Sequence, residues 1–222
     1  MPEALAFDVY GTLVDPLAMG ERLKPVVGDE LAEPMAKLWR EKQLEYTFRR
    51  GLMRSYENFD VCTRQALDYA ARALGAELSE EARRRMIAEY VSLSPFADVA
   101  AGLETMKEAG HSLVAFSNGV EATLRALLER SGLLRTLDDV VSVDDLGTFK
   151  PDPEVYRYLC RRLGRPPSET WLISSNPFDV IGAKSVGLNA AWVRRDPATP
   201  FDPWGIEPDL VVADLGDLAG KL

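Results

Sequence analysis

The sequence has few of the residues that bind zinc or form disulfides. Its 222 residues include two cysteines and one histidine. Cys62 and Cys160 lie far apart in the chain and belong to no CxxC pair. A structural zinc site needs a full set of Cys and His ligands, and a disulfide framework needs several cysteine pairs, so both are excluded. The two thiols are expected to be core residues.

The chain also lacks a long apolar run and an excess of basic residues. No run approaches the roughly 20 residues of a transmembrane helix, and residues 1–20 have neither the basic start nor the apolar core of a signal peptide. We therefore expect a cytoplasmic protein with no membrane contact. With 26 Lys and Arg against 35 Asp and Glu, the formal charge is −9, which argues against a nucleic-acid partner. An anionic small molecule would have to be met by individual Arg or Lys side chains.

Short apolar runs of strand length recur along the chain, at residues 4–10, 112–117, 140–143, 170–175, 190–194 and 210–212. Between the later runs, segments with apolar residues at helical spacing each close near a glycine; they are residues 98–110, 120–131, 153–164 and 178–187. Alternating strands and helices predict an α/β fold, a Rossmann-like, doubly wound and mainly parallel sheet. The proline-rich stretch 196–208 is typical of a surface loop.

Residues 15–94 differ from the rest of the chain, because they have apolar residues at helical spacing but no convincing strand. This pattern predicts two domains, a core of residues 1–14 and 95–222 and an all-helical cap of residues 15–94 inserted after the first strand. Both ends of the cap then join the core near the carboxyl end of that strand, where open α/β sheets bind ligands. The cap is therefore placed to act as a lid.

Polar residues stand at the ends of the predicted strands or just beyond them. They are Asp8 in FDVYGTL, Ser117 and Asn118 in SNG, Lys150 in KPD, and Ser174, Asn176 and Asp179 in SSNPFD. Because the carboxyl ends of parallel strands meet at one edge of a sheet, these side chains are expected to converge there. An aspartate at a strand end is by itself more often a turn former or a helix cap, so the other three motifs are needed to favour a nucleophile.

These four motifs, in this order and with a helical insertion between the first and the second, resemble those of the haloacid dehalogenase superfamily. The resemblance spans nearly the whole chain. A narrower resemblance, at DVYGTL, at LWREKQLEYT in the cap and at SSNPFD, is to the L-2-haloacid dehalogenase branch. It implies a hydrolase acting on carbon–halide bonds, which converts short-chain L-2-haloacids to 2-hydroxy acids plus halide through an aspartyl ester.

Two departures from the phosphatases of that superfamily bear on metal binding. Those phosphatases resemble one another in an Asp two residues after the nucleophile and an acidic cluster in the fourth motif, which hold Mg²⁺. This chain has Tyr10 at the first place and Ser174 and Ser175 at the second. A divalent ion screens an aspartate from a phosphate dianion, whereas one Lys or Arg can neutralise the carboxylate of a 2-haloacid. We therefore expect a reaction that uses neither metal nor cofactor.

The resemblance also implies roles for individual residues. Asp8 is the nucleophile that attacks C2, and water then hydrolyses the ester at the Asp8 carbonyl carbon. Lys150 would keep Asp8 ionised and help to hold the substrate carboxylate, and Asp179 would position or deprotonate the water. The other catalytic residues are Thr12, Ser174 and Asn176. The substrate-binding residues are Ser117, Asn118, Arg40 and Tyr156, with an apolar wall of Tyr10, Leu44, Phe59 and Phe178 around C2.

Simpler interpretations stay open for several of these residues. Arg40 lies in a cap rich in arginine, and only the LWREKQLEYT resemblance singles it out. Tyr156 falls six residues after Lys150 and is equally consistent with an ordinary half-buried helix tyrosine. Core packing would account for the apolar wall. Glu41 and Phe178 stand where many relatives carry Gln and Trp, so the range of haloacids stays open.

Two other functions are kept as alternatives. A phosphatase of the same superfamily with an unusual ion site would release phosphate and lose activity in EDTA. A non-catalytic binding protein on the same fold would show no turnover, but it needs no Asp8 beside Lys150. Relatives are commonly dimers, so the resemblance also implies a homodimer. Four apolar cap residues fit either a dimer contact or the pocket wall, namely Leu52, Met53, Tyr56 and Phe59.

Overall fold

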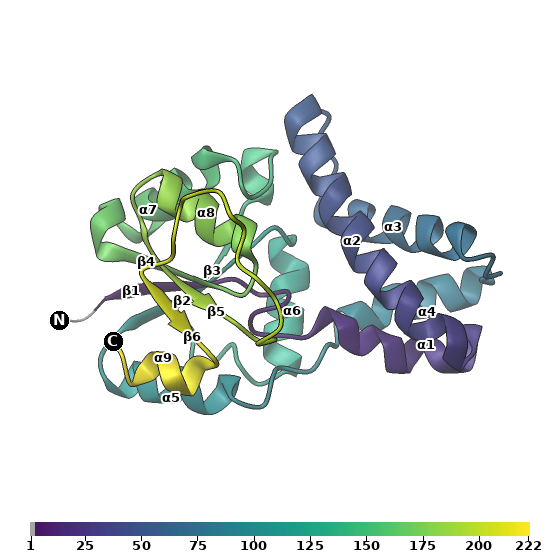
Figure 1. The fold of residues 1–222 in the computed structure, drawn as a ribbon, viewed down its shortest axis with the longest axis horizontal. Coiled ribbons are helices and arrows are strands. Elements are labelled where there is room, and N and C mark those ends of the chain that lie inside the picture. The colour runs from purple at the N-terminus through teal and green to yellow at the C-terminus, as the bar shows by residue number, and fades with distance from the viewer. Residues whose placement is uncertain (1–2) are drawn as a thin grey trace.

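The computed structural model describes residues 3–222, and its centre is one six-stranded sheet (Figure 1). The strands are β1 (Ala4–Phe7), β2 (Ser112–Ser117), β3 (Asp139–Ser142), β4 (Thr170–Ser174), β5 (Asn189–Val193) and β6 (Leu210–Val212). Their order is β3-β2-β1-β4-β5-β6, and every neighbouring pair is parallel. This confirms the predicted doubly wound sheet. The order reverses direction between β1 and β4, which is where such sheets form a ligand crevice.

The first strand ends three residues earlier than the apolar run 4–10 predicts. After Phe7 the chain turns, and the carbonyl of Val9 accepts hydrogen bonds from the N–H groups of Leu13 and Val14 at 2.9 and 3.0 Å. Gly11 occupies the turn with φ of +96°, a conformation that glycine adopts without strain. The turn brings the backbone after Asp8 back beside the strand end.

Alternate residues of the buried strands face opposite helical layers, as a doubly wound sheet requires. One face packs on α5 (Val99–Glu108), α6 (Glu121–Arg130) and α9 (Leu215–Ala219), and the other on α7 (Pro153–Leu163) and α8 (Pro177–Ser185). The four helices predicted in this part of the chain agree with α5 to α8 within two residues at each end. Only the short α9 was not predicted.

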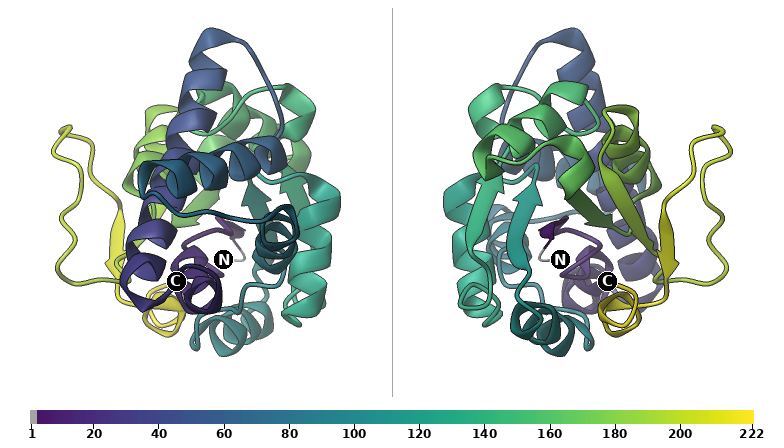
Figure 2. Two further views of the ribbon diagram at one scale, coloured as in Figure 1. Left: turned by 90° about the vertical axis from the view of Figure 1, so that its right-hand side faces the viewer. Right: turned by 90° about the vertical axis from the view of Figure 1, so that its left-hand side faces the viewer.

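A second group of helices lies beyond the carboxyl ends of the strands, on the right in Figure 1 and in front in the left view of Figure 2. It comprises a 3₁₀ turn (Pro16–Ala18), α1 (Met19–Val27), α2 (Asp29–Met53), α3 (Phe59–Ala73) and α4 (Glu80–Tyr90). Its two ends leave the sheet region side by side, because Val14 and Pro95 form an antiparallel bridge and the N–H of Phe96 donates to the Leu13 carbonyl at 3.1 Å. The helical insertion is thus joined to the sheet region by two chain segments that lie side by side.

The chain from Arg194 to Asp209 contains neither helix nor strand and projects from the β5–β6 edge of the sheet (Figure 2). This agrees with the surface loop predicted over 196–208, and Trp204 is exposed there. Within residues 3–222, no helix combines the length and the apolar composition that crossing a bilayer takes.

Candidate active site

The four polar motifs meet at the carboxyl edge of the sheet, beneath α2. Asp8 follows β1, Ser117 ends β2, Lys150 follows the turn after β3, and Asn176 follows β4. All four line one small cavity. The parallel order of the strands, rather than nearness in sequence, produces this convergence.

Asp8 is buried and accepts three hydrogen bonds from side chains. Its Oδ2 accepts from Thr12 Oγ1 at 2.9 Å and from Asn176 Nδ2 at 2.8 Å. Its Oδ1 accepts from Lys150 Nζ at 3.2 Å. Thr12 is itself held, because its Oγ1 accepts from the backbone N–H of Ser175 at 2.8 Å. The carboxylate is therefore fixed in orientation, and Oδ1 is the oxygen with fewer donors.

Lys150 lies between two carboxylates and has 1% of its surface exposed. Its Nζ contacts Asp179 Oδ2 at 2.8 Å and the carbonyl oxygen of Phe116 at 2.8 Å, in addition to Asp8. The ammonium also stands 4.2 Å from the centre of the Phe116 ring. Every donor of this ammonium thus has a partner, as a buried charge requires.

Asp179 is fully buried at the start of α8, and Tyr156 Oη on α7 donates to its Oδ1 at 2.8 Å. Burial raises the pKa of the Asp179 carboxyl above its usual range, the Lys150 ammonium opposes this rise, and the Asp8 charge adds to it. Burial also raises the pKa of Tyr156, so its hydroxyl remains a donor. Asp179 and Tyr156 lie behind Lys150 and do not line the cavity.

Two turns after the strands hold the other polar groups. The Asn118 Oδ1 accepts from the backbone N–H of Lys150 at 2.9 Å, which leaves the Nδ2 group as the donor side of this amide. Ser117 Oγ accepts from the N–H of Gly119 at 3.2 Å, and Ser174 Oγ accepts from the N–H of Asn176 at 3.1 Å. Ser174 is thus a turn-forming residue that is fully buried behind the cavity wall.

Arg40 reaches the cavity from α2. Its Nη2 donates to the Tyr10 carbonyl at 2.9 Å, and its Nη1 donates to Gln43 Oε1 at 2.8 Å. Gln43 is buried, also accepts from Tyr90 Oη at 3.0 Å, and donates to Thr63 Oγ1 at 2.6 Å. Arg40 is therefore distinguished from the exposed arginines of the cap by this network.

The cavity has a volume of about 10 Å³. Its lining combines the charged and amide groups above with an apolar side, and consists of Asp8, Tyr10, Arg40, Leu44, Phe59, Ser117, Asn118, Lys150, Asn176 and Phe178. Of the eight residues expected to bind substrate, seven line this cavity and Tyr156 does not. Glu41, which stands where the resemblance places Gln, is exposed and does not line the cavity. It therefore does not affect the size of the cavity.

The donors around Asp8 do not suit a magnesium ion. Both oxygens of the Asp8 carboxylate already accept hydrogen bonds, and the Lys150 ammonium lies beside Oδ1, where a bound metal ion would have to lie. Asp179, the second carboxylate that Lys150 contacts, is likewise paired with this ammonium. Within the part of the chain that the structure describes, no three His, Cys, Asp or Glu side chains come close enough to share a metal ion.

Two residues of the site were not found from the sequence. Gln43 holds Arg40, but a glutamine within a helix carries no sequence signal for that role. Gly182 lies against Tyr156, where an added Cβ would stand 2.4 Å from Oη and 2.7 Å from Cζ. Only glycine leaves room for that ring, and a glycine inside a predicted helix was the one available hint.

The four apolar residues left open divide into two pairs. Phe59 lines the cavity, and Tyr56 donates a hydrogen bond to Asp144 across the boundary between the insertion and the sheet. Leu52 and Met53, at the end of α2, are largely exposed.

Comparison with known proteins agrees with this geometry. Residues 2–187 match the haloacid dehalogenase-like hydrolase family. The (S)-2-haloacid dehalogenase 4A of Burkholderia cepacia is 40% identical over 197 residues, which is 89% of this chain and 85% of that protein. The L-2-haloacid dehalogenase of Xanthobacter autotrophicus superimposes with a TM-score of 0.92 at 34% identity, covering 99% of this chain and 98% of that one. A second structure of that enzyme carries chloropropionic acid covalently bound, again with a TM-score of 0.92. On the sheet order, the site and these matches, the chain belongs to the haloacid dehalogenase-like hydrolase family, in its L-2-haloacid dehalogenase branch.

Proposed function

We propose that this protein is a hydrolytic dehalogenase that converts short-chain L-2-haloacids to 2-hydroxy acids and halide. The observation that carries the proposal is the buried Asp8 with Lys150 on its Oδ1, facing a cavity whose other polar groups can receive a carboxylate and a halide. A relative with chloropropionic acid covalently bound supports the same chemistry.

Substrate binding is assigned from the donors that line the cavity. Ser117 Oγ stands on the side of the sheet and donates to the substrate carboxylate, and the Lys150 ammonium, whose three N–H groups are already paired, attracts that carboxylate through its charge. Arg40 and the Nδ2 group of Asn118 face the leaving halide, since a departing anion is stabilised by donors held in place. Leu44 completes the apolar wall with the three aromatic residues Tyr10, Phe59 and Phe178, and the wall keeps bulk water from the reacting carboxylate.

The first step is a displacement at C2. Asp8 Oδ1 forms a bond to C2 as the carbon–halogen bond breaks, and the halide leaves with the bonding electron pair. Attack from the side opposite the halide inverts C2. Thr12 and Asn176 hold Oδ2, which keeps Oδ1 turned toward the cavity.

The second step is hydrolysis of the aspartyl ester. Water adds to the Asp8 Cγ, the Cγ–Oδ1 bond breaks, and the 2-hydroxy acid leaves with the former Oδ1. One proton of the water passes by way of the Lys150 ammonium to Asp179 and returns by the same path to the departing Oδ1, and the second proton is released to solvent as the Asp8 carboxylate forms again. Asp179 does not line the cavity, and the Lys150 ammonium, which contacts both Asp179 Oδ2 and Asp8 Oδ1, supports this proton path.

The charge balance favours a monoanionic substrate without a metal. With all groups ionised, the two carboxylates of Asp8 and Asp179 are matched by Lys150 and Arg40. A haloacid adds one negative charge to this neutral set, whereas a phosphate monoester adds about two.

The test is halide release from L- and D-2-chloropropionate in the presence of EDTA, with Asp8→Asn as the inactive control. We expect release from the L isomer that EDTA does not reduce. No release from either isomer by folded protein would contradict the proposal, and EDTA-sensitive phosphate release from a monoester would favour a phosphatase instead.

The intermediate is tested by a single turnover in H₂¹⁸O with excess enzyme. Hydrolysis at Cγ places one ¹⁸O in the Asp8 carboxylate and none in the product, and mass spectrometry of the peptide containing Asp8 detects it. Label in the hydroxyl of the product instead would show direct attack of water on C2.

Three wider predictions belong to the same proposal. We divide the chain into a core of residues 1–14 and 95–222 and a cap of residues 15–94, which the Val14–Pro95 bridge supports. The exposed apolar end of α2 supports a homodimer. The two buried, unbridged cysteines are consistent with a cytoplasmic location.

A further inference from the structure

The catalytic cavity is too small for the proposed substrate. Its volume of about 10 Å³ admits roughly one water molecule. The smallest chiral 2-haloacid has several times as many non-hydrogen atoms as one water molecule. Part of the cavity wall therefore has to move before the substrate can bind. The structure contains two larger clefts that end against this wall, and they indicate where it opens.

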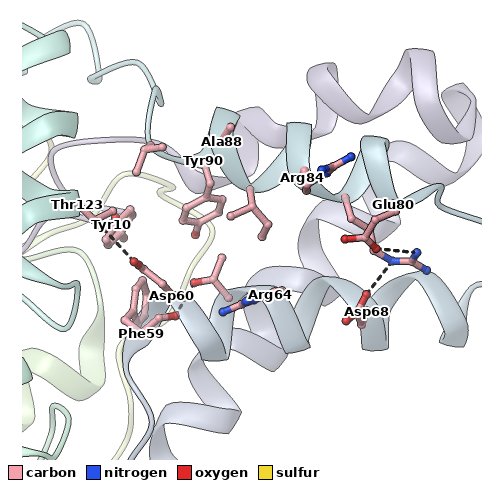
Figure 3. A pocket seen from close by; sticks show the side chains of 14 residues that line it. Tyr10, Phe59, Asp60, Arg64, Asp68, Glu80, Arg84, Ala88, Tyr90 and Thr123 are labelled. Atoms are coloured by element: carbon pink, nitrogen blue, oxygen red, sulfur yellow. Dashed lines mark hydrogen bonds and ion pairs between the residues drawn. The ribbon is translucent and has the colours of Figure 1, made fainter.

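The first cleft has a volume of about 770 Å³ and lies between α3, α4 and α6 (Figure 3). It shares Tyr10 and Phe59 with the catalytic cavity. Both rings are buried, and the Tyr10 ring centre lies 5.2 Å from that of Phe59 and 5.5 Å from that of Tyr90. Tyr90 in turn packs on the buried Trp39. Opening this side would break a block of packed core rings.

The second cleft has a volume of about 1010 Å³ and lies between the end of α2 and the loops 148–153 and 202–204. It shares Lys150 and Phe178 with the catalytic cavity. The ring at this boundary is Phe178 of α8, and Phe48 of α2, which lines the cleft but not the cavity, contacts Phe178 edge to face with ring centres 5.0 Å apart. Phe48 is 37% exposed, so its ring can turn toward solvent without leaving a cavity in the core.

The surroundings of this pair suit the alkyl chain of a substrate. Leu52 and Trp204 are exposed at the cleft, with 89% and 73% of their surface accessible, and the exposed Pro151 and the buried Phe149 also line it. An alkyl group on C2 that passes Phe178 would therefore lie against apolar side chains. The catalytic lysine is at the inner end of the same cleft.

We propose that Phe48 controls access to the catalytic cavity and thereby the length of the C2 substituent that the enzyme accepts. In this proposal the second cleft binds the alkyl chain of longer 2-haloacids. This rests on the proposed dehalogenase function. Phe48 acts through Phe178 and the width of the opening, and it takes no part in displacement or hydrolysis.

The test compares kcat/KM for L-2-bromopropionate and L-2-bromohexanoate. Phe48→Ala is expected to raise about tenfold the ratio of kcat/KM for L-2-bromohexanoate to kcat/KM for L-2-bromopropionate. Phe48→Trp is expected to lower this ratio. Ile87→Ala, in the first cleft, is the matched control and should leave the ratio unchanged. An unchanged ratio in folded Phe48→Ala, or an increase in Ile87→Ala alone, would overturn the proposal.

Binding of the halogen-free acids separates this inference from the proposed function. Calorimetry measures the Kd of propionate and hexanoate for the wild type and for Phe48→Ala, and the variant is expected to gain about tenfold for hexanoate relative to propionate. If the wild type releases no halide, the dehalogenase assignment fails and the binding ratio still tests the cleft. An unchanged binding ratio would refute the role of Phe48 in either case.

Discussion

Replacement of Lys150 by methionine tests the electrostatic arrangement of the site. The ammonium stands 3.2 Å from Asp8 Oδ1 and 2.8 Å from Asp179 Oδ2, and 1% of the residue is exposed. At an effective dielectric constant of about 20, each contact corresponds to an attraction of about 5–6 kcal/mol before desolvation. Measured losses on removing one partner of a buried pair are smaller, about 3–5 kcal/mol.

The expected consequence in Lys150→Met is uptake of a proton by the two carboxylates. Asp179 takes it up first, because burial already raises its pKa and Lys150 is the strongest influence that lowers it. Loss of the ammonium therefore raises the pKa of Asp179 further, so a larger fraction of this carboxyl is protonated at pH 7. Halide release at pH 7 should fall about 10²–10³-fold, and the remaining rate should rise with pH where the wild type is flat.

Stability supplies a second measurement with a defined sign. A carboxyl whose pKa is raised in the folded state contributes stability that is present below its unfolded value, near 4, and is lost as pH rises through the folded value. The deficit of Lys150→Met in urea unfolding should therefore be larger at pH 8 than at pH 5. Lys184→Met is the matched control, because Lys184 pairs with Asp209 at 2.7 Å nearer the surface and should change little. Activity of Lys150→Met within about threefold of the wild type, or a pH profile of the wild-type shape, would refute the reasoning.

Three further substitutions probe the residues around this pair. Tyr156→Phe removes a hydrogen bond that lowers the pKa of Asp179, so the acid limb of kcat/KM should move up by about one pH unit; an unmoved limb would count against Asp179 as the base. Gly182→Ala should displace the Tyr156 ring, destabilise the protein by about 1–3 kcal/mol in urea unfolding and shift the same limb upward, whereas a normal pH profile would show that the ring stays in place. Gln43→Met frees Arg40 on one side and should lower kcat about tenfold with a smaller change in KM; a change in KM alone would place Arg40 in ground-state binding.

The amino-acid sequence was sufficient for the order and type of most elements. Apolar runs of strand length, helical spacing between them and a glycine after each helix are local signals, and each reflects the preference of short segments. Gly110, Gly132, Gly164 and Gly187 all have positive φ in the structure, as helix ends of this kind require. The convergence of the four motifs also followed from the sequence, because parallel strands place their carboxyl ends at one edge.

Only the tertiary structure decided how these residues contact one another. The sequence does not indicate that Lys150 bridges two carboxylates, that Gln43 holds Arg40, or that Gly182 makes room for Tyr156. Each of these depends on side chains from different elements meeting at a distance of about 3 Å, which periodicity does not encode. The same limit applies to the closed cavity and its Phe48–Phe178 boundary, because the width of an opening is set by how two packed layers meet and not by either segment alone.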